Sequence, residues 1–136
     1  MRSATEMSVS AEVNELASAV ANIAGNGKLV RRNVHSAECD NRVGDATGQV
    51  KYVLGFYNID LPGARHPNAF KLVQKHWRDL GWKITDDRFR QELNEGVLSA
   101  KDPRAGIDFT LSSTTSPDAL AILISSGCFR EAQPMT

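Results

Sequence analysis

The sequence predicts a single α+β domain in which an antiparallel sheet of five to six strands carries two main helices, packed mostly on one face, in the order α-β-β-α-β-β-β-β. Two segments repeat apolar residues at the spacing of a helix, and the other apolar segments are short, β-branched and bounded by turn residues. Two helices are too few to cover both faces of a wide parallel sheet, which favours antiparallel pairing. The domain is expected at residues 10–130, between a disordered or vector-derived tail (1–9) and a flexible tail (131–136).

The first helix is expected from Ser10 to Ala24. Apolar residues recur at steps of three and four from Val13 to Ile23, so they share one face of a helix. The glycines of "GNG" at 25–27 end this helix, because glycine adopts the backbone conformations that follow a helix C-terminus.

Two strands follow the first helix. Residues 28–36 alternate apolar and polar side chains, which is the period of a half-buried strand, and the Asp, Asn and Gly residues of 40–49 predict a turn. Residues 50–59 form the longest β-branched and aromatic run of the chain, with apolar side chains on both faces. Such a strand is expected in the centre of the sheet.

The second helix is expected from Pro67 to Leu80, after a turn at 60–67. Proline suits the first position of a helix, and Gly81 follows the last apolar residue. The apolar stripe of this helix consists of Phe70, Val73, Trp77 and Leu80.

Four short strands are expected after the second helix. They lie at 82–84, 96–100, 106–112 and 119–126, and the polar segment 86–96 is expected to be a turn or a short helix. Short strands joined by turns favour hairpins over a β-α-β alternation.

The bulk composition excludes several classes of protein. The chain has 136 residues, of which 41% are hydrophobic and 24% charged, so it has the composition of a globular domain rather than of a disordered segment. Sixteen basic residues balance sixteen acidic ones, and no nucleic-acid partner is expected from that balance. No run approaches the roughly 20 apolar residues that a membrane-spanning helix requires, so no membrane span is expected in this chain.

The N-terminal residues do not resemble an export signal. "MRSATEMS" is a poor leader, and Glu12 and Glu15 precede the short apolar stretch at 17–25 too closely. The domain is therefore expected to be extracytoplasmic, secreted or attached to the cell envelope, if a leader has been removed, and cytoplasmic otherwise. A lipid anchor would belong to such a missing leader.

The two cysteines, Cys39 and Cys128, each follow the end of an expected strand and are 89 positions apart. Four interpretations compete. A disulfide suits a small domain with an export history and needs the two strand ends to be neighbours. Two separate buried thiols, a metal site and a catalytic thiolate are the alternatives, although neither cysteine belongs to a CxxC pair or has a histidine at ligand spacing.

Three histidines and one basic ridge are the other candidates for a functional role. His66 lies in a proline-rich turn, where an exposed imidazole could act as a base or ligand, although capping of the turn by the side chain is the commoner role. His35 and His76 are expected at the surface. The second helix carries Lys71, Lys75 and Arg78 on one face. This ridge is either a solvated helix face or a contact for a phosphate or an acidic partner. No catalytic or metal site and no cofactor is assigned.

Within residues 70–130 a helix with a tryptophan leads into a "GW" strand, and a phenylalanine-bearing strand precedes a final strand that ends in Ser-x-Cys. The residues of this pattern are Trp77, Gly81, Trp82, Phe109, Ser126 and Cys128. In this pattern the segment resembles the C-terminal half of small exported proteins and lipoproteins of actinobacteria. The resemblance implies an extracytoplasmic domain in which Cys39 pairs with Cys128, and it implies no activity.

These observations favour a non-enzymatic domain that binds a protein or a small ligand and is stabilised by a Cys39–Cys128 disulfide. One alternative is an enzyme that uses Cys128 as nucleophile with His66 or His76 as base. Another is a cytoplasmic inhibitor or interaction module that uses an uncovered face of the sheet or the basic ridge.

Overall fold

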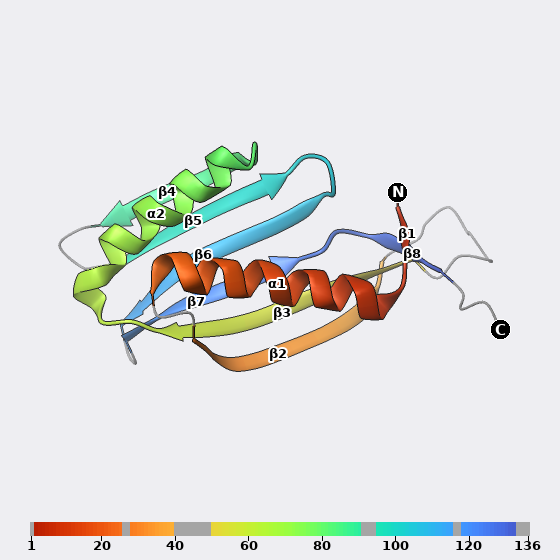
Figure 1. Ribbon diagram of the computed structural model, residues 1–136, viewed down its shortest axis with the longest axis horizontal. Helices are drawn as coiled ribbons and strands as arrows, with labels where there is room; N and C mark the ends of the chain where they lie inside the picture. Colours follow the sequence, from red (N-terminus) through yellow and green to blue (C-terminus); the bar gives the residue numbers. More distant parts are fainter. Residues whose placement is uncertain (1, 26–27, 40–49, 91–94, 116–117, 133–136) are drawn as a thin grey trace.

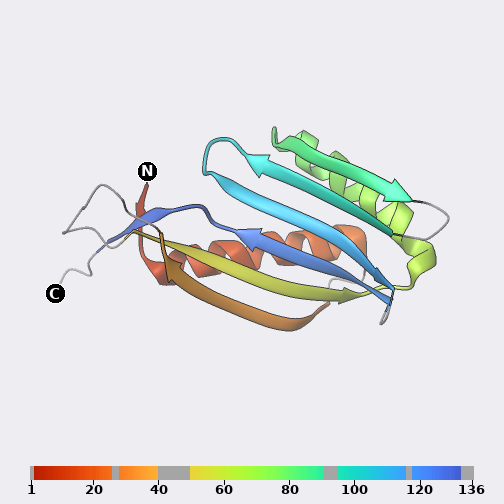
Figure 2. The ribbon, with the colours of Figure 1, turned by 180° about the vertical axis from the view of Figure 1, so that it is seen from behind.

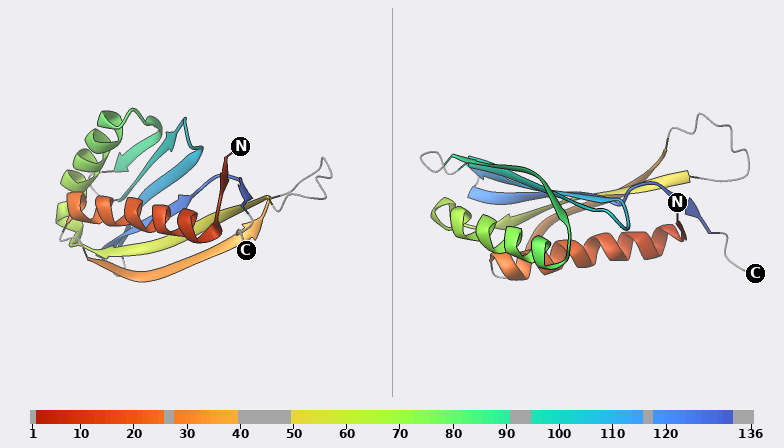
Figure 3. Two further views of the ribbon diagram at one scale, coloured as in Figure 1. Left: turned by 45° about the vertical axis from the view of Figure 1, so that its right-hand side comes forward. Right: turned by 90° about the horizontal axis from the view of Figure 1, so that it is seen from above.

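The computed structural model describes residues 2–25, 28–39, 50–90, 95–115 and 118–132. In chain order its elements are β1 (Ser3–Ala4), α1 (Glu6–Ala24), β2 (Leu29–Glu38), β3 (Val50–Asp60), the 3-10 turn η1 (Gly63–Arg65), α2 (His66–Asp79), β4 (Lys83–Arg90), β5 (Glu95–Asp102), β6 (Ile107–Thr115), β7 (Asp118–Ser125) and β8 (Phe129–Glu131). Both helices lie against the same face of one sheet (Figures 1 and 3). The expected α+β class with two helices on one face is confirmed.

The sheet is antiparallel except for the short parallel pair β1–β8. Its strand order is β1-β8-β3-β7-β6-β5-β4, and β2 pairs with the other side of β3. Strands β2 and β4 are therefore the two long edge strands, and β3 is central, as its sequence predicted. Over the described residues the sheet has eight strands, more than the expected five to six, because β1 and β8 are only two and three residues long and have no periodicity to detect.

Helix α1 begins earlier than expected. Thr5 caps it by accepting a hydrogen bond from the backbone N–H of Ser8 (3.1 Å), and Val9 extends the buried apolar stripe by one turn. Within the expected tail 1–9, Ser3 and Ala4 thus belong to β1, and the residues from Glu6 onward belong to α1. At the other end Glu131 closes β8, and residues 133–136 lie outside the described residues.

Helix α2 matches its prediction within one residue at each end. Phe70, Val73 and Trp77 of its apolar stripe are buried, with Trp77 only 1% exposed. Leu80, the last residue of the expected stripe, follows the helix and is 50% exposed. The indole of Trp77 packs against Phe109 with ring centroids 4.9 Å apart and stacks on Trp82 at 6.2 Å. Aromatic packing therefore attaches this helix to the sheet.

The segment 86–96 was expected to be a turn or short helix, which is wrong for 86–90 and 95–96, because these residues belong to β4 and β5. Residues 91–94 lie outside the described residues. As an edge strand β4 obtains its backbone hydrogen bonds from β5 while most of its side chains remain polar, which weakens the apolar alternation that identifies a strand. The other long strands end within three residues of their expected bounds. The expected turn at 40–49 lies outside the described residues.

The core fills the space between the helices and the sheet. Gly55 allows α1 to approach β3, because a Cβ at this position would lie 2.8 Å from Val13 Cγ1 and 2.7 Å from Tyr57 Cε2. Since Val53, Tyr57 and Ile59 are buried on the same side as Gly55, the even-numbered side chains of β3 point to the face without helices. None of the described helices is long and apolar enough to cross a membrane.

Candidate functional site

Cys39 and Cys128 form a disulfide, with their Cα atoms 6.3 Å apart. The N–H of Cys39 donates to the carbonyl of Val50 (2.8 Å), which extends the β2–β3 ladder, and Cys128 directly precedes Phe129, the partner of Lys51 on the other side of β3. The bridge therefore ties edge strand β2 to β8 across the first residues of β3. Because the two sulfur atoms are bonded to each other, neither is a thiolate, and a metal site or a nucleophile requires a thiolate.

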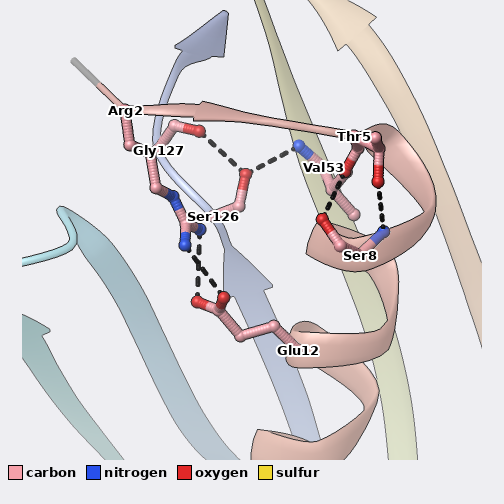
Figure 4. A network of polar contacts seen from close by, with 7 residues as sticks. All are labelled: Arg2, Thr5, Ser8, Glu12, Val53, Ser126 and Gly127. Carbon is pink, nitrogen blue, oxygen red and sulfur yellow. Dashed lines mark hydrogen bonds and ion pairs between the residues drawn. The ribbon is translucent and has the colours of Figure 1, made fainter. Parts of the chain in front are cut away.

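Ser126 shapes the chain just before this bridge (Figure 4). Its buried hydroxyl accepts a hydrogen bond from the N–H of Val53 (2.9 Å) and donates one to the carbonyl of Gly127 (2.8 Å). Gly127 has φ +74°, a conformation that favours glycine, and a Cβ there would lie 2.6 Å from the carbonyl oxygen of Gly106. Ser126 and Gly127 thus redirect the chain from β7 to β8 and position Cys128.

His66 has the capping geometry that is the commoner role of a histidine in a turn, and not the exposed imidazole that a base or ligand would need. It is the first residue of α2 and only 1% exposed, and its Nε2 lies 2.8 Å from the carbonyl oxygen of Leu61. Its Nδ1 is buried without a hydrogen-bond partner among the described residues. This contact holds the chain that enters α2, so the geometry of His66 is that of a structural residue.

The other two histidines lie far apart in the fold. His35 is exposed on β2, and its ring stacks on that of Phe56 with centroids 6.2 Å apart. His76 is half-buried on α2, and burial lowers its pKa. The described part of the chain contains no group of three or more His, Cys, Asp or Glu residues that could hold a metal ion.

The three residues of the basic ridge are exposed on α2 as expected, but their environments differ. Lys75 Nζ binds Asp79 Oδ2 at 2.9 Å, and this hydrogen bond and the charge of Asp79 raise the pKa of Lys75. Lys71 makes no hydrogen bond or ion pair with a described residue and instead lines a hollow. Lys71 is therefore the member of the ridge best placed to receive an anion.

This hollow, the α2–β4 groove, lies between helix α2 and edge strand β4 and has a volume of about 380 Å³. The rings of Phe70 and Phe89 form its apolar floor, with centroids 5.2 Å apart. On the polar side of the groove, Gln74 Nε2 donates a hydrogen bond to Asp87 Oδ2 at 2.7 Å. The residues that line it are Pro67, Phe70, Lys71, Gln74, Asp87 and Phe89.

A second hollow, of about 370 Å³, lies where β4, β5 and β6 run side by side. Arg88 and Arg90 reach it from β4, and Ser112 reaches it from β6. The guanidinium of Arg88 is already held by both carboxylate oxygens of Asp86 at 2.9 Å. The residues that line this hollow include no aromatic side chain, unlike the α2–β4 groove with its two phenylalanines.

The face of the sheet opposite the helices is uncovered in the described structure (Figures 2 and 3). Phe56 lies in the middle of central strand β3 on this face and is 43% exposed. The register places its apolar and aromatic neighbours around it on β2, β3 and β7. This open-face cluster consists of His35, Tyr52, Leu54, Phe56 and Leu123.

Both long edges of the sheet carry features that disfavour pairing with another strand. The β2–β3 register shifts between Val30 and Arg32, and the β4–β5 register shifts between Ile84 and Asp86. Irregularities of this kind and charged side chains protect edge strands from pairing. The open face, rather than an edge, is thus the larger surface available for contact.

The sequence indicated part of these surfaces. It predicted apolar side chains on both faces of the strand at 50–59, but it did not show which face the helices cover. The α2–β4 groove was missed because Asp87 and Phe89 were assigned to a turn or a short helix. No family model, no curated protein and no solved structure matches this chain.

Proposed function

We propose that this chain is a non-enzymatic, disulfide-stabilised binding domain that docks another protein on the open face of its sheet. The observation that carries this proposal is the open-face cluster, where Phe56 is 43% exposed on interior strand β3. The face on which it lies carries no helix (Figure 2). Large exposed apolar side chains that gather on one face are typical of interaction surfaces.

The size of the open face suits a protein partner. Six strands side by side, from β2 to β4, are about 29 Å wide at roughly 4.8 Å per strand, and eight residues extend about 26 Å. The resulting area of about 750 Å² is close to the roughly 800 Å² that each partner contributes to a standard interface.

The chemistry of the open face suggests how a partner would bind. The aromatic and aliphatic cluster lies on β2, β3 and β7, and small polar side chains such as Thr110 and Ser99 adjoin it on β6 and β5. The Ser99 and Thr110 hydroxyls lie 3.0 Å apart and hydrogen-bond to each other. A partner with an apolar centre and a polar rim would complement this arrangement.

The disulfide supports an extracytoplasmic setting for this function. Disulfides persist in oxidising compartments and are rare in the reducing cytosol. The likeness of residues 70–130 to exported proteins supports the same setting. The alternative of a Cys128 nucleophile would require reduction of the bridge, and the alternative of a cytoplasmic interaction module would require the same surface in a reducing compartment.

The decisive experiment substitutes the open-face cluster and a matched apolar residue elsewhere. Phe56→Ser removes the centre of the cluster, and Leu72→Ser removes an equally exposed side chain (41%) on α2. A partner captured by the unchanged protein is identified, purified and titrated against all three proteins. We expect Phe56→Ser to weaken binding at least about tenfold, since central interface anchors contribute about 2 kcal/mol or more, and Leu72→Ser to bind normally.

Two further measurements show which surface is used. Methyl resonances of Leu54 and Leu123 should shift on binding, and sedimentation should show whether a second copy of the chain occupies the face instead. Equal affinity of the Phe56→Ser and unchanged proteins, or shifts confined to the helices, would contradict the proposal.

A further inference from the structure

We propose that the α2–β4 groove binds a small aromatic compound that carries a carboxylate together with a hydrogen-bond donor. This site lies on the helix side of the sheet, because Phe89 contacts Phe70 of α2. It is therefore separate from the open face and independent of the protein partner proposed above.

The floor of the groove accounts for the aromatic part of the ligand. The rings of Phe70 and Phe89 are inclined at 59° with centroids 5.2 Å apart, so they present two aromatic surfaces to the same space. Aromatic rings prefer such tilted or offset neighbours. A volume of about 380 Å³ lies within the roughly 300–1,000 Å³ range of ligand pockets.

The rim accounts for the two polar groups of the ligand. Lys71 supplies a positive charge that no described residue neutralises, and its ammonium can pair with a carboxylate. Asp87 Oδ2 accepts a hydrogen bond from Gln74, whereas Oδ1 accepts none from any described residue. A ligand with a carboxylate alone would be repelled by Asp87, so a donor group beside the carboxylate completes the match.

The geometry of the site is held by its own contacts. Phe70 is only 7% exposed and is part of the core, so its ring is fixed. The Gln74–Asp87 hydrogen bond joins α2 to β4 and fixes the carboxylate. The groove is therefore organised before a ligand arrives, which lowers the entropic cost of binding.

Four indole compounds separate the two polar contributions. L-Tryptophan has both a carboxylate and an ammonium, indole-3-propionate has only the carboxylate, tryptamine has only the ammonium, and 3-methylindole has neither. Each is titrated into the full chain at millimolar concentration and followed by amide and side-chain NMR shifts. We expect the tightest binding for tryptophan, with shifts at Phe70, Lys71 and Phe89.

Three variants assign the contacts. Lys71→Gln should lower the affinity for tryptophan and for indole-3-propionate about tenfold and leave the affinity for tryptamine unchanged, since a charge-assisted hydrogen bond contributes on that scale. Asp87→Asn should instead lower the affinity for tryptophan and tryptamine. Phe89→Leu should lower the affinity for all four compounds.

Lys75→Gln is the matched control, because it removes a positive charge one turn along the same helix but outside the lining of the groove. Equal losses in Lys71→Gln and Lys75→Gln would show a general effect of charge and overturn the proposal. Shifts that map to the open-face cluster, or no shifts with any of the four compounds, would also overturn it. Amide spectra of each variant without ligand verify that the fold is retained.

Discussion

Removing the Cys39–Cys128 bridge should cost this domain a large part of its stability. The bridge closes a loop of 89 residues, and the chain-entropy relation converts that length into about 4.5 kcal/mol at 25 °C. Domains of this size have a total free energy of unfolding of roughly 5–15 kcal/mol. The double variant Cys39→Ser/Cys128→Ser is therefore expected to be marginally folded at physiological temperature.

Urea unfolding, followed by far-UV circular dichroism, measures this loss. The free energy of unfolding in water is compared between the oxidised protein, the reduced protein and the double variant. The reduced protein and the double variant should agree, and reductant should leave the double variant unchanged. That last comparison separates loss of the bridge from any other effect of the reductant.

Two results would refute this reasoning at different points. Two free thiols in unreduced, denatured protein would show that the bridge does not form. A bridged protein whose free energy of unfolding falls by less than about 1 kcal/mol on reduction would show that the unfolded chain is not constrained as the chain-entropy relation assumes.

Three further outcomes are expected. Ser126→Ala should lower the free energy of unfolding by about 1–3 kcal/mol, because it leaves the N–H of Val53 without its side-chain acceptor, and hydrogen exchange of that amide should accelerate; normal exchange there would count against the role given to Ser126. Trp77→Ala should cost about 3–5 kcal/mol in urea unfolding, because it empties a core site that is 1% exposed, and a loss below 1 kcal/mol would contradict the packing described. Burial lowers the pKa of the His76 imidazole from 6.5, so the unfolded chain binds a proton before the folded protein does as the pH falls. The contribution of His76 to the free energy of unfolding is therefore complete above pH 6.5 and is lost as the pH falls through the folded-state pKa. NMR titration of the folded protein should give a pKa below 6.5 for His76, and the free energy of unfolding should depend less on pH in His76→Gln. A measured pKa of 6.5 or above would contradict the effect of burial.

The parts of the fold that the sequence predicted well are those with strong periodicity. Helix α2 was placed within one residue because its apolar stripe, proline and glycine all agree. The expected start of α1 was late because Thr5 acts as the cap and Val9 as the first buried residue, and neither stands out before the packing is known. Only the start of strand β4 was predicted, at 82–84, because the rest of this edge strand owes its conformation to pairing rather than to its own apolar pattern.

The candidate sites were less accessible from the sequence. The basic ridge was identified, but only the structure distinguishes Lys71, beside the groove, from Lys75, which is paired with Asp79. The open-face cluster brings together His35, Phe56 and Leu123 from three strands, and such long-range register is not encoded in local spacing.

The disulfide and the open face are coupled by strand β2. This edge strand contributes His35 to the open-face cluster. Among the described strands it pairs with β3 alone, so no second described strand holds its far end. The bridge fixes that end to β8 across β3. Edge strands with one partner open more readily than central ones, so reduction should release β2 before the rest of the sheet. An oxidising compartment would therefore do more than stabilise the fold, because it would also keep the binding face that we propose complete.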